Sequence, residues 1–473
     1  MLLKREDIIN EMEKGLDVVI IGGGITGAGI LNALSKSRLK IGLLEARDYS
    51  IGTSSRSSKL IHGGLRYLEN FQFSVVKDSV RERDFLLENS RSVGREDFLI
   101  PMDDYSWNRF EMFAGMKLYS LFSKKIRATW YSRDEIIKKY PHFSDIKFRG
   151  GYIYAEGVVD DSRLVMDNIM NARINGALSL NYAKVTGIDF TDDHYIIEFE
   201  DTINKKNHQT KARMIINSAG IWVNDIFEML SSKFSEMKEY SSMLKMSKGD
   251  HIIIPREFYS PEVAIALRSS IDRRQVFIIP RGEVVIIGTT ETRYEGDKYD
   301  PKPSEEEIDY LIKSVSRYVK FGREDIINSY SGIRPLFGKG EDLGKISREY
   351  RIIKNGRIIN VVGGKLTTYR SVAFQILDSI SKEFSLNLGR DLELNYIPDY
   401  NLIKDTDPEI RKFRYYVEYE QAYHIDDILW RREGHYIFSK DSGLSKVDRA
   451  WEAIRTVNPD ENEKENYRKI INR

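Results

Sequence analysis

The hydrophobic pattern is clearest near the beginning of the chain. Residues 18–21 form a short apolar run, which is the pattern of a strand buried on both faces. Ala28, Leu31 and Leu34 then recur at helical spacing, and a second apolar run in "KIGLLE" ends at Glu45. The pattern predicts a strand, a tight turn, a helix and a second strand, with a carboxylate at the tip of that second strand.

The turn between the first strand and the helix carries three glycines in GxGxxG spacing, Gly22, Gly24 and Gly27. In a dinucleotide-binding turn the first glycine makes the turn, the second lets the backbone approach a pyrophosphate, and the third lets helix pack on strand. The helix N-terminus then faces the phosphates. Glu45 follows Gly27 by 18 residues and can accept hydrogen bonds from a ribose. The motif alone fits NAD as well as FAD.

Further along the chain, polar and apolar residues alternate in "HYIIEFED", "HIIIP", "QVFIIP" and "EVVIIGTT". Alternation of this kind predicts strands, which we expect to form a second, mostly antiparallel sheet. Residues 372–384 have helical spacing and follow the glycine turn of "GGKLTTYR". The helix N-terminus there would stabilise negative charge on a bound cofactor. After about residue 390 the sequence becomes charged, aromatic and helical in spacing.

These patterns predict an α/β protein with three parts. We expect a discontinuous Rossmann-like cofactor domain, a mostly antiparallel β-sheet substrate domain and a small α-helical C-terminal domain. The expected cofactor domain comprises residues 1–75, 150–228 and 328–390, and the expected substrate domain comprises 76–149 and 229–327. Residues 391–473 would form the C-terminal domain.

Residues 52–69, "GTSSRSSKLIHGGLRYLE", combine glycines, hydroxyl side chains and basic residues. In a simple NAD enzyme the second strand would lead into another crossover helix. Here it leads into this polar segment, whose many hydroxyls suit a long cofactor with both a pyrophosphate and a ring to cover. The segment therefore favours FAD.

The same segment resembles the one typical of FAD-dependent glycerol-3-phosphate dehydrogenases, within the flavin-dependent amine and hydroxyacid oxidoreductases. Other stretches match in the family's order: "VVDDSRL", "INSAGIWVND", "KGDHIIIP", "VVIIGTTE", "YSGIRPL", "ISREY" and "VVGGKLTTYR". The resemblance covers about residues 16–380, and more weakly "DDILWRR" at 426–432. It implies FAD as the cofactor. The expected FAD contacts are Gly22, Gly24, Ile25, Thr26, Gly27, Glu45, Ala46, Thr53, Ser54, Ser55, Ser58, Lys59, Leu60, His62, Val185, Ala219, Gly220, Trp222, Gly364, Lys365, Leu366 and Thr367.

The resemblance also implies oxidation of sn-glycerol 3-phosphate to dihydroxyacetone phosphate, with hydride passing from C2 to flavin N5. Such a site needs cations for the phosphate and one proton acceptor. The expected substrate contacts are Arg66, Tyr67, Arg334, Arg348, Lys365 and Thr368. Arginine suits phosphate because its planar fork binds two oxygens at once.

Two of the seven histidines lie in the matching motifs. Imidazole is the usual base at neutral pH, and we expect His251 to accept the proton while Arg334 stabilises the developing alkoxide. His62 is expected to pack against the isoalloxazine or tune it. Glu291 stands where the family would have aspartate, so we give it no substrate role.

Composition excludes several classes of partner and site. The formal net charge of +1 gives no general reason to expect nucleic acid as a partner. The absence of cysteine excludes disulfides and thiol catalysis, and no His, Asp or Glu spacing indicates a metal. We see no export signal and no membrane-spanning run. These observations favour a cytoplasmic protein. The resemblance implies that the electrons pass to a quinone, and we expect a homodimer that is peripheral on the cytoplasmic face of the membrane and attaches through a membrane-anchoring partner protein.

Three alternatives stay open. The first is the same oxidation with oxygen as acceptor, that is, a glycerol-3-phosphate oxidase. The second is a flavin oxidoreductase for another hydroxy acid or amine, and the third is a non-catalytic flavoprotein.

Overall fold

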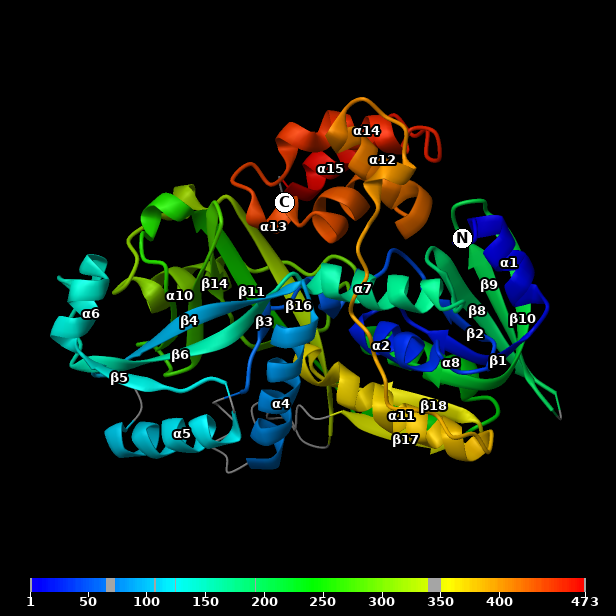
Figure 1. Ribbon diagram of the computed structural model, residues 1–473, viewed down its shortest axis with the longest axis horizontal. Coiled ribbons are helices and arrows are strands. Elements are labelled where there is room, and N and C mark those ends of the chain that lie inside the picture. The colour runs from blue at the N-terminus through cyan, green and yellow to red at the C-terminus, as the bar shows by residue number, and fades with distance from the viewer. Residues whose placement is uncertain are drawn as a thin grey trace.

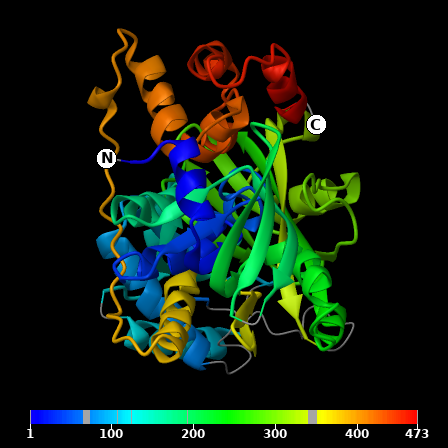
Figure 2. The same ribbon diagram turned by 90° about the vertical axis from the view of Figure 1, so that its right-hand side faces the viewer.

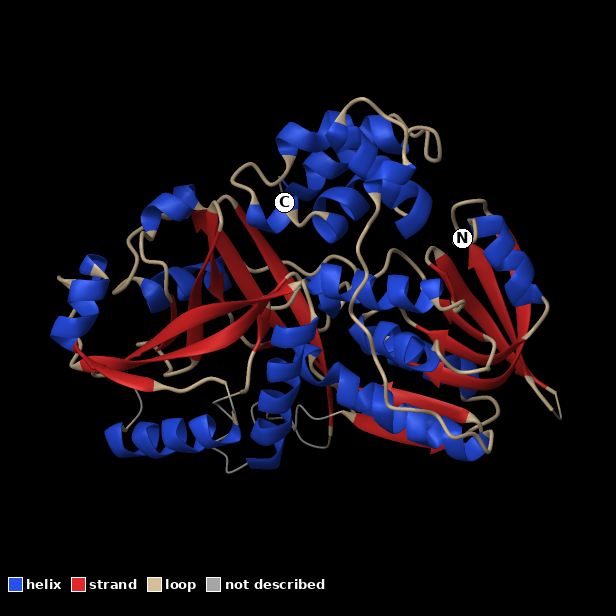
Figure 3. Cartoon of the chain, in the orientation of Figure 1, coloured by secondary structure: helices blue, strands red, loops and turns tan. Residues whose placement is uncertain are grey.

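Two β-sheets lie side by side, and a group of helices covers both at one end of the molecule (Figure 1). The computed structural model describes residues 2–64, 73–105, 108–123, 125–191, 193–338 and 350–471. Figure 3 shows the sheets in red and separates them from the C-terminal helices at the top.

The first sheet contains the predicted strand, turn, helix and strand. Its order is β17-β18-β10-β1-β2-β7, and the five strands from β18 to β7 are parallel. Two further strands, β8 and β9, continue from β10 as an antiparallel meander. The bounds are β1 Leu16–Ile21, β2 Ile41–Leu44, β7 Leu178–Leu180, β8 Ala183–Phe190, β9 Tyr195–Asp201, β10 Lys206–Asn217, β17 Arg351–Asn355 and β18 Ile358–Val362.

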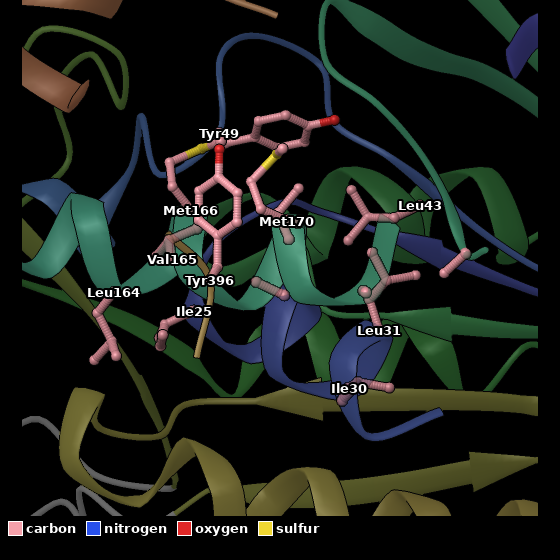
Figure 4. Packing of buried hydrophobic residues seen from close by; sticks show 14 of the residues in the cluster. Ile25, Ile30, Leu31, Leu43, Tyr49, Leu164, Val165, Met166, Met170 and Tyr396 are labelled. Carbon is pink, nitrogen blue, oxygen red and sulfur yellow. The ribbon is translucent and has the colours of Figure 1, made fainter. Parts of the chain in front are cut away.

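Helices cover both faces of this sheet. One face packs against α2 (Ile25–Leu34), α7 (Asp161–Ile174) and α11 (Tyr369–Glu383). The other packs against α1 (Arg5–Glu13), α8 (Val223–Leu230) and α9 (Met237–Ser242). Figure 4 shows side chains of α2 and α7 meeting in the first of these cores. Burial on both faces explains why β1 and β2 consist of apolar runs and do not alternate.

The second sheet is mostly antiparallel, and among the strands that the structure describes only β12 and β4 pair in parallel. Three of the four alternating stretches lie in this sheet as predicted, whereas "HYIIEFED" forms β9 of the first sheet. Its order is β15-β11-β14-β13-β12-β4-β6-β3, with β16 beside β11 and β5 beside β6. The bounds are β3 Leu60–Ile61, β4 Val93–Pro101, β5 Thr129–Ser132, β6 Gly150–Val159, β11 Leu244–Pro255, β12 Ala264–Arg268, β13 Gln275–Arg281, β14 Val284–Gly288, β15 Thr292–Arg293 and β16 Asn328–Phe337.

Three of these strands differ from the expected domain boundaries. We expected residues 60–61, 150–159 and 328–337 in the cofactor domain, but β3, β6 and β16 pair with strands of the second sheet. The helices of this half are α4 (Phe73–Asn89), α5 (Arg109–Phe122), α6 (Arg133–Lys139) and α10 (Glu305–Val315).

The C-terminal helices share their core with the cofactor half. They are α12 (Pro408–Glu420), a short π-helix (Asp427–Arg432), α13 (His435–Phe438), α14 (Val447–Ile454) and α15 (Glu463–Ile471). The segment between α11 and α12 runs along the molecule as the extended orange loop of Figure 2 and joins the two groups of helices. Leu394, Tyr396 and Phe413 belong to the same buried cluster as α2 and α7.

Candidate active site

The glycine turn after β1 requires glycine at two of its positions. Gly22 has a φ of +104°, and a Cβ there would lie 2.6 Å from the carbonyl oxygen of Ser218. A Cβ at Gly27 would lie 1.9 Å from the carbonyl oxygen of Gly22. The first contact shapes the turn and the second lets α2 approach β1, which are the roles expected in a dinucleotide-binding turn.

The N-terminus of α2 points to the space where the pyrophosphate of a dinucleotide would lie. Its N-cap residue, Gly24, supplies no side-chain cap. The hydroxyl of Ser54 accepts a hydrogen bond from the backbone N–H of Ile25 at 2.9 Å. The polar segment after β2 thus returns to the glycine turn, and the helix end offers N–H groups and a positive dipole to an anion.

Glu45 lies at the tip of β2, next to this turn. Its carboxylate accepts hydrogen bonds from the backbone N–H of Gly23 at 2.6 Å and of Arg47 at 2.9 Å. Burial nevertheless raises the pKa of Glu45 to about 7, from an ordinary value of 4.5. A ribose hydroxyl donating to this carboxylate would favour its charged form.

One cavity joins the glycine turn to the second sheet. Of the expected residues it is lined by Gly22, Gly24, Ile25, Thr26, Glu45, Ala46, Thr53, Ser54, Ser58, Leu60, His62, Val185, Ala219, Gly220, Trp222, His251, Arg334, Gly364, Lys365, Leu366 and Thr367. These residues come from both halves of the molecule. The cavity therefore connects a dinucleotide-binding turn to the expected proton acceptor.

Four expected residues do not line this cavity. Gly27 packs behind the glycine turn, and Thr368 is buried at the start of α11. Ser55 and Lys59 are buried on the other side of their segment, where the Lys59 ammonium donates to the carbonyl oxygen of Ser55 at 2.7 Å. Arg66, Tyr67 and Arg348, which we expected at the substrate, lie outside the described residues.

His251 is held on β11 by contacts on its ring and on one nitrogen. Its ring stacks on Tyr330 at 4.7 Å with an interplanar angle of 8°, and its Nε2 lies 2.9 Å from the hydroxyl of Ser58. Gly288 on the neighbouring strand leaves room for the ring, because a Cβ there would lie 2.2 Å from it. Burial, and then the charges of Arg334 and Lys59, hold the pKa of His251 well below its usual range. The imidazole is therefore neutral at pH 7.

Arg334 lies on β16, which pairs with β11, so the guanidinium and the imidazole come from adjacent strands. The guanidinium lies over Gly249, where a Cβ would approach it to 2.3 Å. It donates a hydrogen bond to the hydroxyl of Thr289 at 3.0 Å. This arrangement places a permanent positive charge close to His251.

Sequence reasoning missed Arg56 and Tyr299, both of which line the cavity. Arg56 donates to the carbonyl oxygen of Tyr299 at 3.3 Å, and its guanidinium carbon lies 4.9 Å from the ring centre of Trp430 in the π-helix. Burial lowers the pKa of Arg56. The only sequence signal was an arginine between two serine pairs, and Tyr299 lies in a loop without a motif.

The residues that line the cavity fit FAD. The glycine turn and the open helix end suit a pyrophosphate, and Glu45 suits a ribose. Trp222 lines the cavity with a buried Nε1 that has no hydrogen-bond partner within the described ranges, so a ligand acceptor would complete it. At the far end, Gly363 and Gly364 turn the chain at φ values of +75° and +110° into the start of α11. These features define a cavity that fits the cofactor of a flavoprotein.

Comparisons with known proteins agree with this reading. A family profile described as FAD dependent oxidoreductase matches residues 17–365. A protein of Staphylococcus saprophyticus named aerobic glycerol-3-phosphate dehydrogenase is 35% identical over 401 residues, which are 82% of this chain and 71% of that protein. A protein of the same name from Staphylococcus epidermidis is 32% identical over 447 residues, 91% of this chain and 79% of the relative.

Solved structures show the same fold. A glycerol-3-phosphate dehydrogenase from Bacillus halodurans complexed with FAD has a TM-score of 0.76 at 23% identity, covering 99% of this chain and 97% of that one. An L-alpha-glycerophosphate oxidase from Mycoplasma pneumoniae with FAD bound has a TM-score of 0.62 at 16% identity, covering 80% and 98%.

The chain belongs to the FAD dependent oxidoreductases and, within them, to the family of FAD-dependent glycerol-3-phosphate dehydrogenases. FAD is its cofactor. The family, the cofactor and the fold class expected from the sequence are thereby confirmed.

Proposed function

We propose that the protein oxidises sn-glycerol 3-phosphate to dihydroxyacetone phosphate and passes the electrons to a quinone. The observation that carries the proposal is the pairing of His251 and Arg334 on adjacent strands at the cavity of the FAD-binding turn. A neutral base and a fixed cation are what the oxidation of an alcohol requires. The family of the curated relatives supports this choice of substrate.

The side chains divide the work as follows. Bound FAD would supply the acceptor for the hydride that leaves C2 of the substrate. His251 takes the proton of the C2 hydroxyl, and Arg334 lowers the energy of the negative charge that develops on that oxygen. The phosphate brings negative charge to the cavity, which raises the proton affinity of the imidazole. Lys365 lines the cavity as a further cation for the phosphate, and we propose Arg66, Tyr67 and Arg348 as additional contacts.

The test is anaerobic addition of sn-glycerol 3-phosphate to the FAD-loaded protein while the flavin absorbance is followed. We expect rapid bleaching that plain glycerol does not produce. Arg334→Ala should abolish the bleaching. Arg334→Lys should keep the positive charge but lose the two-pronged contact that a guanidinium makes. Arg149→Ala, at an arginine whose side chain is 78% exposed, is the matched control. A loaded wild-type protein that stays yellow would refute this substrate.

The electron acceptor distinguishes two versions of this function. With a quinone acceptor, a soluble quinone analogue should restore the yellow colour of the bleached protein much faster than dissolved oxygen does. If oxygen restores it at a comparable rate and peroxide accumulates, the protein is an oxidase. Bleaching by other hydroxy acids or by amines would move the assignment to another substrate class.

A peripheral contact with the membrane, which a quinone acceptor requires, is supported by α5. This helix lies along the lower edge of the second sheet (Figure 1) and exposes Phe110, Phe113 and Leu121 by 76%, 46% and 79%. Large apolar side chains on one exposed helix suit the boundary between headgroups and acyl chains. Among the described residues, no helix is both long enough and apolar enough to cross a bilayer.

We expect the wild-type protein to sediment with anionic phospholipid vesicles. Phe110→Ser/Leu121→Ser should weaken this sedimentation, whereas Ile174→Ser, at a residue 60% exposed on α7, should not. Equal sedimentation of both variants and the wild type would refute the role of α5. The cytoplasmic location, the homodimer and the membrane-anchoring partner remain proposals, and light scattering of the purified protein tests the dimer.

A further inference from the structure

Asp161, from the "VVDDSRL" motif that matched the family without a role, is buried at the start of α7. One carboxylate oxygen accepts from the Lys59 ammonium at 2.6 Å and from the backbone N–H of Ser162 at 2.9 Å. The other accepts from the backbone N–H of Ser57 at 3.2 Å and from its hydroxyl at 2.6 Å. The carboxylate therefore holds the loop of residues 55–59 at two points.

Lys59 completes this arrangement from within the loop. Its backbone has a φ of +57°, in the left-handed region where side chains other than glycine are uncommon. Its ammonium also donates a hydrogen bond to the carbonyl oxygen of Ser55, so Lys59 links the two ends of the loop. A buried cation needs a partner, and Asp161 provides it.

This loop makes one contact with the imidazole of His251 and holds Tyr330, the residue that makes the other. The Ser58 hydroxyl lies 2.9 Å from Nε2. The carbonyl oxygen of Ser57 accepts from the hydroxyl of Tyr330 at 2.9 Å, and the Tyr330 ring stacks on the imidazole. A change in the shape of the loop would therefore shift the ring plane and the hydrogen bond together.

The two nitrogens of His251 differ in their surroundings. Nδ1 is buried and has no hydrogen-bond partner within the described ranges, whereas Nε2 meets Ser58, which lines the cavity. If Nε2 carried the proton, the only lone pair of the neutral ring would lie on the buried Nδ1. A base that serves the cavity must therefore carry its proton on Nδ1 and keep the lone pair on Nε2.

We propose that Ser58 is a positioning residue that selects this tautomer of His251, and that the buried Asp161–Lys59 pair holds Ser58 in place. In the resting site the hydroxyl of Ser58 donates to Nε2. When the substrate binds, its C2 hydroxyl replaces Ser58 as the hydrogen-bond donor to Nε2 and then transfers its proton to that nitrogen. The chemical steps are therefore the same as in the proposed function. The inference rests on the proposed function, in which His251 is the base.

The first test uses Ser58→Ala and Ser58→Thr, with anaerobic flavin reduction by sn-glycerol 3-phosphate from pH 6 to pH 9. Loss of one hydrogen bond at the reacting nitrogen should slow the limiting rate of reduction about tenfold in the alanine variant. The apparent dissociation constant of the substrate should change less than about twofold, because Ser58 acts on the base and not on the phosphate. The threonine variant, which keeps the hydroxyl, should restore most of the rate.

The second test concerns the ion pair. Asp161→Asn alone would leave Lys59 buried without a counter-charge and endanger folding. Asp161→Asn/Lys59→Met removes both charges, and Lys36→Met/Asp391→Asn removes an exposed ion pair as the matched control. We expect the first double variant to bind FAD and to show the slow reduction of Ser58→Ala, and the control to behave as wild type. If the first double variant does not fold, the Ser58 variants alone decide.

A measurement that does not depend on turnover separates this inference from the proposed function. Long-range ¹H–¹⁵N spectra of histidine-labelled protein report the tautomer, and His251→Gln assigns the signal. We expect the Nδ1-protonated neutral form at pH 7, and a mixture of tautomers in Ser58→Ala. An unchanged tautomer together with a wild-type reduction rate in the variants would overturn the inference. A wild-type protein that is not bleached would refute the substrate instead, while the spectra would still test Ser58.

Discussion

The affinity for FAD should depend on pH through Glu45. Burial raises the pKa of this carboxyl to about 7 in the protein without ligand, although two backbone N–H groups donate to it. Ribose hydroxyls donate to a carboxylate but gain less from a carboxylic acid, so FAD binds the deprotonated form. With this pKa, about nine-tenths of the sites are protonated at pH 6 and about one-tenth at pH 8. The dissociation constant of FAD should therefore be about tenfold larger at pH 6 than at pH 8.

The measurement is a titration of the stripped protein with FAD at pH 6, 7 and 8, followed by flavin fluorescence. Glu45→Gln should bind FAD more weakly at pH 8 and show little dependence on pH. Because its pKa is raised on folding, Glu45 also makes the protein without FAD less stable as the pH rises from about 4.5 to about 7. A wild-type affinity that is flat with pH, or an equal slope in the glutamine variant, would show that the reasoning is wrong.

Three further predictions concern the frame around the site. Gly27→Ala should abolish FAD binding, because its Cβ would lie 1.9 Å from a backbone oxygen, whereas Gly389→Ala, where nothing lies within 4 Å, should bind normally in the same titration. Asp48→Asn would remove the buried carboxylate that Arg431 and Arg432 share, and it should cost about 3–5 kcal/mol of unfolding free energy. Lys36→Gln, at an exposed ion pair, should cost about 0–1 kcal/mol. Urea unfolding measures both losses, and equal losses would contradict this expectation. A chain ending at residue 395 should yield no soluble FAD-bound protein, because it lacks part of the shared core; recovery of such a protein on a sizing column would show that the core closes without the C-terminal helices.

The cofactor half was readable from the sequence because its signals are local. The apolar runs of β1 and β2, the three glycines and Glu45 lie within about thirty residues of one another, and each has one physical explanation. Three of the four alternating patterns likewise predicted antiparallel strands of the second sheet. Strand pairing is not local, however, which is why β3, β6 and β16, and the stretch that forms β9, were expected in the wrong half.

The polar segment after β2 shows a second limit of prediction from sequence, which concerns the directions of side chains. Its hydroxyls and its lysine were expected to lie along FAD, and Ser54 and Ser58 do line the cavity. The left-handed backbone at Lys59 turns that side chain the other way, toward a carboxylate about a hundred residues later. The pairing of Arg56 with the ring of Trp430 is similarly remote in sequence. A sequence pattern gives the side chains of a loop but not the directions in which they point.

The ion pairs beneath the C-terminal helices link two distant parts of the gene. Asp48 follows Glu45 by three residues, and its buried carboxylate accepts from Arg431 at 2.6 Å and from Arg432 at 2.8 Å. A hybrid protein whose region after residue 390 comes from a relative would therefore fold only where both source proteins carry an acid at position 48 and bases at positions 431 and 432. These three positions must therefore change together, although about 380 residues separate the acid from the two bases.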